Sequence, residues 1–238
     1  MKFLYNAPAL LHKDALIVGD THFGMEDKLR RSGVHAGNFS EIILERLEKL
    51  LDETKAKKLI LLGDVKENIT TVDSITSRII SKLKMKIEVI IVRGNHDGGI
   101  EVTGVGIKPA EGFVYEGLGL THGHSWPAKE LLMCDYLVCG HQHPMVKLHD
   151  KLGKFHSEPV WVIADVNPDK MKEHYEDFNP NIKLVLMPAY NPLVGSAINF
   201  PTKKQLGPIL NNKLFKLDHA LLFRLDGPSL GELKNIGD

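Results

Sequence analysis

Apolar residues in the first hundred positions predict repeated strand–helix units. Short runs rich in Ile, Leu and Val at 15–19, 58–62 and 88–92 are typical of buried strands. Between them, residues 40–51 and 72–83 carry apolar side chains at helical spacing, and Ser40 is in position to cap the first of these helices. The order strand, helix, strand, helix, strand predicts right-handed crossovers and a mainly parallel sheet.

After Glu101 the helical periodicity fades and short β-like runs follow one another. They occur at 112–115, 118–121, 137–140, 159–164, 183–187 and 219–225. A helix is expected at 126–134. A second sheet packed on the first predicts one α/β domain spanning 1–238, a layered α/β/β/α sandwich of two mixed sheets flanked by helices.

Two stretches fall outside this scheme. Residues 165–181 are polar and carry two prolines, which predicts a surface insertion with a short helix within 169–177. Residues 196–210 are interrupted by Gly and Pro and are expected to be mostly irregular.

Composition narrows the class of protein. A chain of 238 residues that is 43% hydrophobic can bury a sizeable core. Its 30 basic residues balance its 30 acidic ones, which argues against a basic nucleic-acid footprint over the whole surface and leaves a local patch open. Two cysteines are too few for a disulfide framework. With no signal-like apolar N-terminus and no run of about 20 apolar residues, we expect a cytoplasmic protein that does not enter membranes.

Residues that can bind metals follow the predicted strands in five short blocks. The blocks are Asp20-Thr21-His22, Gly63-Asp64, Gly94-Asn95-His96-Asp97, His122-Gly123-His124 and Gly140-His141-Gln142-His143. They hold six of the chain's 12 histidines. A pair of divalent ions needs several imidazoles and carboxylates and one shared ligand, and parallel sheets bind ligands beyond the carboxyl ends of their strands. The set predicts a site for two metal ions.

Each block by itself also has an ordinary structural interpretation. Asp20 can cap the next segment, Asp64 can be a turn residue after a strand, and Asn95-His96 can belong to a β-turn. In His-x-His on extended backbone the two rings point the same way, so both His141 and His143 can face the ions. The order and joint inventory of the five blocks favour the metal site over these alternatives.

In their order along the chain, the five blocks resemble the calcineurin-like metallophosphoesterase superfamily over residues 15 to 145. Within that superfamily, the stretches 20–24, 30–33 and 187–195 resemble the small archaeal members and the bacterial ligase-associated phosphoesterase. This second resemblance extends the similarity to nearly the whole chain.

The resemblance implies a role for each ligand-type residue. One metal ion is expected on Asp20, His22 and His143, and another on Asn95, His122 and His141, with Asp64 bridging the two. His96 is expected to stabilise the transferring phosphoryl group or to protonate the leaving oxygen.

Further residues are expected to support this site. The resemblance implies that Glu67 orients His96, although Glu67 can equally be a surface residue. His124 and Asp97 are expected beside the ligands. Arg30 and Arg31 can contact a substrate phosphate through bidentate hydrogen bonds or can be solvated surface charges.

The resulting hypothesis is a phosphoesterase that hydrolyses phosphodiester bonds through a hydroxide bridging two metal ions, with nuclease activity left open. A phosphomonoesterase or nucleotide phosphatase with the same site is the alternative, and a non-catalytic binding module of the same fold is a minor one. The resemblance favours Mn²⁺, while Fe, Zn²⁺ and Ni²⁺ stay open. The expected partner is a phosphodiester, nucleic acid included, and formation of a homo-oligomer is left open.

Overall fold

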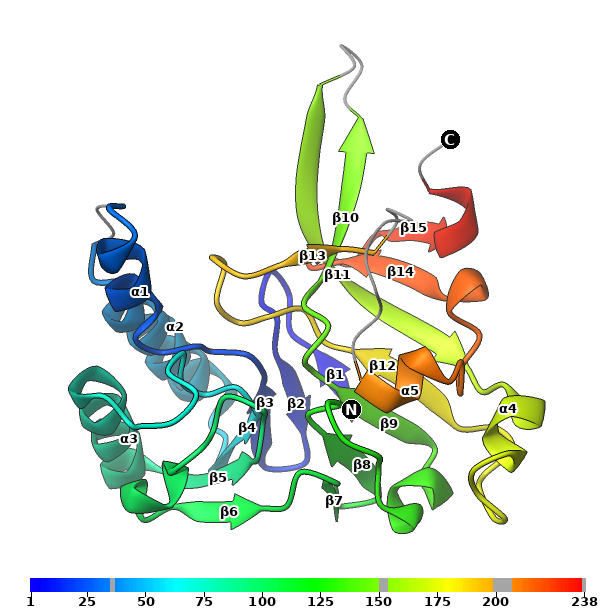
Figure 1. Ribbon diagram of the computed structural model, residues 1–238, viewed down its shortest axis with the longest axis horizontal. Coiled ribbons are helices and arrows are strands. Elements are labelled where there is room, and N and C mark those ends of the chain that lie inside the picture. The colour runs from blue at the N-terminus through cyan, green and yellow to red at the C-terminus, as the bar shows by residue number, and fades with distance from the viewer. Residues whose placement is uncertain (35–36, 150–153, 199–206, 237–238) are drawn as a thin grey trace.

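Two β-sheets lie face to face in the computed structural model, with helices on their outer sides (Figure 1). The structure describes residues 1–34, 37–149, 154–198 and 207–236. The first sheet contains, side by side, β1 (Lys2–Phe3), β2 (Leu10–His12), β3 (Ala15–Val18), β4 (Lys58–Leu62), β5 (Glu88–Val92) and β6 (Gly106–Lys108). Strands β3 to β6 are parallel, as the strand–helix alternation predicted for β3 to β5.

Three α-helices are described in this first half of the chain. They are α1 (Met25–Arg31), α2 (Phe39–Thr54) and α3 (Ser74–Lys86). Alternate strand residues such as Leu59 and Leu61 pack against α2 and α3, while Ile60 and Leu62 face the second sheet. Both faces of these strands are therefore buried, which explains their continuous Ile, Leu and Val runs.

The second sheet is mixed. Its main path runs β13 (Ser196–Ala197), β10 (Pro144–His149), β11 (Phe155–Asp165), β12 (Lys183–Leu186), β9 (Tyr136–Cys139), β8 (Leu118–Thr121) and β7 (Phe113–Tyr115). Strand β14 (Leu221–Arg224) pairs with β11 and with β15 (Ser229–Glu232). The outer face of the second sheet is covered by α4 (Pro168–Lys172) and α5 (Gly207–Asn211). The predicted layered α/β/β/α sandwich of two mixed sheets is confirmed.

Several local predictions need correction. The helix expected at 126–134 is a 3₁₀ helix over Lys129–Met133. The N-cap of α2 is Asn38 and not Ser40, whose hydroxyl instead donates to Glu26 and accepts from the Gly24 N–H. Within 196–210, the described residues include β13 and the start of α5, and residues 199–206 lie outside the described part.

The segment predicted as a surface insertion at 165–181 is largely exposed, and a few buried side chains attach it to the second sheet's core. Met171 and Tyr175 are buried among the residues that α4 and α5 cover. The short helix, at Pro168–Lys172, is capped by the Asn167 side chain, which accepts from the Lys170 N–H. A polar composition concealed the few apolar side chains that attach this segment.

Across the part of the chain that the structure describes, every helix is too short or too polar to cross a membrane. Cys134 and Cys139 are buried free thiols.

Candidate metal centre

Both sheets direct the ends of parallel strands to one place. Asp20, Asp64 and Asn95 follow β3, β4 and β5, which are neighbouring parallel strands of the first sheet. His122 and His141 follow β8 and β9, a parallel pair in the second sheet. The site therefore lies at the carboxyl ends of strands from both layers, where the fold rule for parallel sheets places ligands.

The first group of ligand-type side chains consists of Asp20, His22, Asp64 and His143, each offering an atom within 4.8 Å of the others. His143 Nε2 lies 3.0 Å from Asp20 Oδ1, yet it has no hydrogen-bond partner of suitable geometry. The buried Nε2 of His22 also lacks a hydrogen-bond partner and lies 3.8 Å from Asp64 Oδ2. Two buried imidazole nitrogens are thus directed at carboxylates without hydrogen bonds.

The second group shares Asp64 with the first and adds His122 and His141. His122 Nε2 is 3.3 Å from Asp64 Oδ1 and 3.2 Å from Asn95 Oδ1. The other ring nitrogen, Nδ1, lies 2.9 Å from the Leu62 carbonyl oxygen, which leaves Nε2 as the atom presented to the site. Asp64 is the residue that belongs to both groups.

The backbone at the ligand positions is unusual. Five of them have positive φ angles: Asp20 (57°), His22 (42°), Asp64 (47°), His141 (68°) and His143 (46°). Non-glycine residues adopt this left-handed conformation rarely, at a cost of about 1–3 kcal/mol each, and such residues cluster at functional sites. Because these conformations are strained, the surrounding structure must hold them. The strained turns set the directions in which the five side chains point.

Close packing at two glycines keeps the groups together. A Cβ at Gly63, whose φ is +78°, would lie 2.4 Å from the His122 ring. A Cβ at Gly94 would lie 2.3 Å from Asp64 Oδ1. These glycines let His122 and Asp64 approach the neighbouring strand ends.

His96 lies at the edge of the first group. Its ring centroid is 5.1 Å from that of His22, and its Nε2 is 4.0 Å from Asp64 Oδ2. Its Nδ1 lies 2.9 Å from the backbone carbonyl oxygen of Glu67, and its side chain is 20% exposed. The ring is therefore oriented by a backbone acceptor, with Nε2 facing the cluster.

The Glu67 side chain contacts a different histidine from the one expected. Its carboxylate accepts from His22 Nδ1 at 2.8 Å and also accepts from Lys28. Burial alone would raise its pKa, but hydrogen bonds from His22 and Lys28 outweigh burial and lower the pKa to about 2. Through its side chain Glu67 orients His22, and only through its backbone does it orient His96.

Asp97 shapes the loop that carries Asn95 and His96. Its buried carboxylate accepts from the backbone N–H groups of Gly94 and Val65, at 2.8 and 2.9 Å. The Asp97 carboxylate therefore ties the loop after β5 to the loop after β4, and it faces backbone groups of both loops.

His124 lies beside the second group, with its ring centroid 5.3 Å from that of His122 and 6.0 Å from that of His141.

The two arginines lie on α1, outside the clusters. Arg30 pairs with Asp27 at 2.7 Å, and both Arg30 and Arg31 are exposed near the end of the helix remote from His22. A contact of either with substrate stays a proposal.

Asn191 was not among the predicted site residues, although it lies in the stretch 187–195 that carried the resemblance. Its backbone N–H donates to the Asp20 carbonyl at 3.2 Å, and its side-chain amide donates to the Thr21 and His22 carbonyls at 3.0 and 3.5 Å. The preceding Tyr190 N–H donates to the Gly19 carbonyl at 2.9 Å. A residue about 170 positions away thus holds the turn in which Asp20 and His22 have left-handed backbone angles.

Lys66 was also missed. It is fully buried, and its ammonium group donates to the Asn68 carbonyl and, at 2.5 Å, to the His96 carbonyl. Sequence gives little signal for either residue, because a buried Lys and a distant Asn are recognisable only once the loops are assembled.

The charge of the cluster fits divalent cations. Burial alone would raise the pKa of the Asp20 and Asp64 carboxyls, but the imidazoles around them outweigh burial and lower both pKa values. Burial and the charge of nearby His122 lower the pKa of His141 to about 4, so its ring is neutral at pH 7 and has a lone pair to donate. Ionised carboxylates, a neutral imidazole and the unpartnered nitrogens of His22 and His143 are donors of the kind that Mn²⁺, Fe and Zn²⁺ bind.

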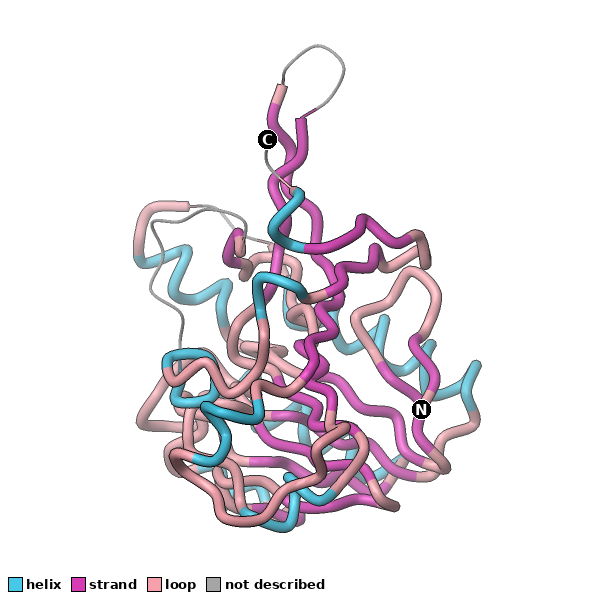
Figure 2. Tube along the Cα trace, turned by 90° about the vertical axis from the view of Figure 1, so that its right-hand side faces the viewer, coloured by secondary structure: helices cyan, strands magenta, loops and turns pink. Residues whose placement is uncertain are grey.

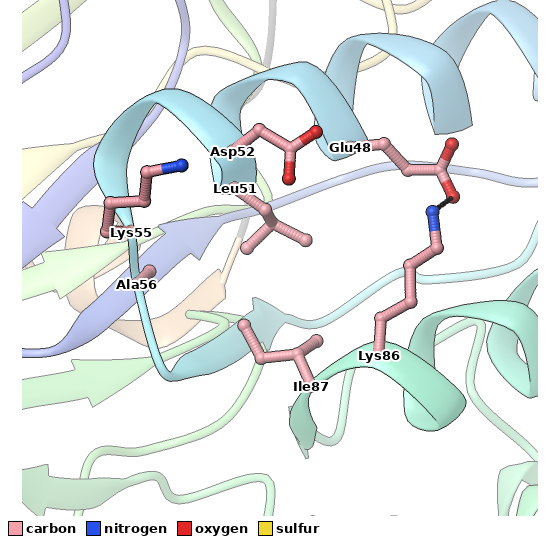
Figure 3. Close-up of a pocket in the computed structure, with 7 residues that line it drawn as sticks. All are labelled: Glu48, Leu51, Asp52, Lys55, Ala56, Lys86 and Ile87. Atoms are coloured by element: carbon pink, nitrogen blue, oxygen red, sulfur yellow. Dashed lines mark hydrogen bonds and ion pairs between the residues drawn. The ribbon is translucent and has the colours of Figure 1, made fainter.

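A cavity elsewhere in the molecule has no such chemistry. About 280 Å³ in volume, it is lined by residues at the C-terminal ends of α2 and α3, where Lys86 Nζ donates to Glu48 Oε1 at 2.6 Å (Figure 3). It lies where these helices lead into the amino ends of β4 and β5, at the opposite edge of the sheet from the ligand loops.

Comparison with known proteins identifies the family. The family model of the calcineurin-like phosphoesterases matches residues 14–131, which include the first four blocks. No curated protein matches the chain. Among solved structures, the chain is similar to the nuclease MPE of Pseudomonas putida, with 20% identity and a TM-score of 0.53, over 92% of this chain and 87% of that one. It is also similar to YfcE, a phosphoesterase from E. coli, with 24% identity and a TM-score of 0.38, over 61% of this chain and 81% of that one.

The chain belongs to the calcineurin-like phosphoesterases. It is accordingly a hydrolase that acts on phosphate esters.

The contacts of Asn191 lead to a testable prediction. Replacing Asn191 by Asp keeps the side-chain oxygen that accepts from the Leu193 N–H but removes the amide donors to Thr21 and His22. We expect Mn²⁺ to bind about 10- to 100-fold more weakly, the usual effect of losing a group that orients metal ligands. Isothermal titration of the metal-free protein with Mn²⁺ measures this.

Asn179→Asp is the matched control, because the Asn179 amide also donates to a backbone carbonyl, that of Cys134, but outside the site. It should leave Mn²⁺ affinity unchanged. Equal affinities for wild type and Asn191→Asp would contradict the assigned role.

Proposed function

We propose that this protein hydrolyses phosphodiester bonds with two divalent metal ions, and that its substrates are nucleic acid strands. The observation that carries the proposal is the position of Asp64, whose carboxylate lies in both groups of ligand-type side chains. A shared carboxylate between two sets of imidazoles is what a pair of ions about 4 Å apart requires.

Each ion would be held by its own set of residues. Asp20, His22 and His143 would hold one, Asn95, His122 and His141 the other, and Asp64 both. Bound divalent ions of this kind lower the pKa of water and offset negative charge on phosphate oxygens. The donors mix imidazole with carboxylate and amide oxygen, which suits Mn²⁺, Fe or Zn²⁺ better than Mg²⁺, because Mg²⁺ prefers oxygen alone. Among the three we favour Mn²⁺ on the family resemblance.

The chain's own groups do the remaining work. Because His96 Nδ1 is engaged with the Glu67 carbonyl, Nε2 is the atom available to exchange a proton or to donate to a phosphate oxygen. Glu67 and Lys28 fix His22, while Asp97 and Lys66 fix the loop that carries His96. The reacting groups are therefore held in place before substrate binds, which is how positioning contributes to rate.

One further observation supports a nucleic acid as the substrate, and another supports a reducing compartment. The Pseudomonas putida protein with the same fold is named a nuclease. Both cysteines are free thiols, as we expect for a cytoplasmic protein.

The experiment that tests the proposal compares two small substrates. With Mn²⁺, we expect faster hydrolysis of the diester bis-p-nitrophenyl phosphate than of the monoester p-nitrophenyl phosphate, and then cleavage of DNA. A panel of Mn²⁺, Fe²⁺, Zn²⁺ and Ni²⁺ added to metal-free protein identifies the preferred ion. If the monoester is the far better substrate, the protein is a phosphomonoesterase and the diesterase proposal is wrong.

A further inference from the structure

A two-stranded arm grows directly out of one of the ligand loops. Strand β10 begins at Pro144, the residue after His143, and pairs with β11 in antiparallel register from Met145 opposite Pro159 to His149 opposite Phe155. Figures 1 and 2 show this hairpin extending well beyond the rest of the molecule. A segment that continues from a ligand is well placed to contact whatever extends out of the site.

The two faces of the arm continue into different hydrophobic cores. Along β11, residues 155, 157, 159 and 161 share one face, and Trp161 packs between the two sheets with residues of the first sheet such as Ile17 and Ile60. The other face, with Val146 and Val160, belongs to the core beneath α4 and α5. Where the arm leaves the sheet, the face that carries Phe155 therefore turns toward the first sheet, the layer that supplies Asp20, Asp64 and Asn95.

The root of the arm confirms this direction. Met145 is opposite Pro159 and shares its face. A Cβ at Gly195 would lie 1.9 Å from Met145 Sδ, so Met145 is packed tightly against the segment 187–195. In that same segment Asn191 holds the turn with Asp20 and His22. At the root of the arm, the face that continues to Phe155 is thus the one next to the metal centre.

That face carries an aromatic ring with a cation against it. Phe155 is 52% exposed, and Lys147 Nζ lies 5.3 Å from the centroid of its ring. Lys154, the residue before Phe155, is exposed as well. Aromatic rings combined with cations are a means by which proteins bind single-stranded nucleic acid.

We propose that the Lys147–Phe155 face of this arm binds the single strand that runs out of the active site, with a base stacked on Phe155 and a phosphate near Lys147. The proposal rests on the proposed phosphodiesterase function and names its substrate class. Because the whole chain has a formal net charge of +0, the attraction is local to the arm and needs no basic surface overall. An unpaired base is required, since stacking on a side chain uses a base face that a duplex buries.

The length of the arm sets a length for the substrate. Six residues separate His143 from position 149, which pairs with Phe155. At about 3.3 Å per residue this is about 20 Å, or about six stacked nucleotides at 3.4 Å each. Small diesters and very short oligonucleotides should therefore not reach Phe155.

The test is kinetic and uses the full chain with Mn²⁺. For a single-stranded DNA of 20 nucleotides, Phe155→Ala should raise KM about 5- to 50-fold, the lower part of the range for losing one stacked base. For bis-p-nitrophenyl phosphate, kcat/KM should not change. Phe155→Trp should restore the KM for DNA, because the indole offers a larger stacking surface.

The contribution of Lys147 is measured by the salt dependence of DNA binding. Lys147→Gln should reduce the slope of log binding constant against log salt concentration by about 0.7, the value for one phosphate contact in a single strand. The matched control is Lys108→Gln, because Lys108 Nζ lies 5.1 Å from the Phe113 ring on strands remote from the arm. That control should leave the slope unchanged.

The outcomes separate the arm from the active site. An unchanged KM for DNA in Phe155→Ala, or an equal loss on bis-p-nitrophenyl phosphate, overturns the arm proposal. Equal sensitivity for duplex and single-stranded DNA also overturns it. If the wild type hydrolyses no diester, the proposed function fails, but fluorescence anisotropy of labelled single-stranded DNA with wild type and Phe155→Ala still decides whether the arm binds it.

Discussion

His96→Ala is expected to lower kcat on single-stranded DNA by about 10²- to 10⁴-fold while both metal ions stay bound. This is the usual contribution of a positioned acid or base. The retained metal follows from the geometry, because the ring lies at the edge of the cluster and Asp64 accepts from the backbone N–H of residue 96, which alanine keeps. Stopped-assay kinetics with Mn²⁺ in excess, together with metal analysis of the dialysed protein, measure the two quantities.

The leaving group distinguishes the two roles considered for His96. If the imidazole protonates the leaving oxygen, the loss should be large for DNA, whose leaving oxygen is a poor one, and small for bis-p-nitrophenyl phosphate. If it stabilises the phosphoryl group, the two losses should be equal. His156→Ala, which changes an exposed histidine of the arm's other face, is the control. Near wild-type turnover on both substrates would remove His96 from the mechanism.

The strands and the ligand blocks were predictable because local pattern and global topology agree. Parallel strands buried on both faces need continuous apolar runs, and their carboxyl ends must meet at one edge. For that reason Asp20, Asp64 and Asn95 could be placed together from sequence. His122 and His141 required the second sheet, yet their strands are also parallel and buried.

The contacts between loops could not be predicted in the same way. Phe23 and Lys66 form an isolated parallel bridge, which brings the loops after β3 and β4 alongside each other. This bridge places the Glu67 carboxylate at His22 and leaves its carbonyl for His96. A count of three positions after Asp64 pointed to Glu67, but which of its atoms contacts which histidine depends on how two loops cross.

The arm was missed for a different reason. Residues 159–164 were predicted as strand because they are apolar, whereas β11 begins at Phe155 and its first residues are exposed. Half of the hairpin lies outside the core, so burial does not impose an apolar run on it. A segment that projects from the core carries a weak hydrophobic pattern, and the structure was needed to find this one.

The strained ligand positions connect the fold with the proposed chemistry. Left-handed angles at Asp20, His22 and Asp64 would relax if their turns were free. The His22 N–H donates to the Asp64 carbonyl at 2.9 Å, and Asn191 holds the other side of the same turn. Bound cations would add to this constraint, so we infer that each ligand turn is stabilised jointly by neighbouring loops and by metal.

Asp64→Asn is expected to weaken both metal ions together. The substitution keeps the shape of the side chain and an oxygen that can accept from the His96 N–H, so the loop after β5 should stay in place. It removes the negative charge shared by the two groups, and the loss of affinity should exceed the about 10- to 100-fold typical for an outer partner of a ligand. Titration of metal-free protein with Mn²⁺ should show both binding events shifted, and turnover at fixed metal should fall with them.

His143→Ala is the informative comparison for Asp64→Asn. His143 belongs to the first group only, beside Asp20, and its removal should weaken one ion and leave the affinity of the other close to that of wild type. Two ions lost in Asp64→Asn and one in His143→Ala is the pattern that a shared carboxylate requires. If Asp64→Asn weakens only one binding event, Asp64 serves a single ion, and the proposed pair of ions loses the ligand that joins them.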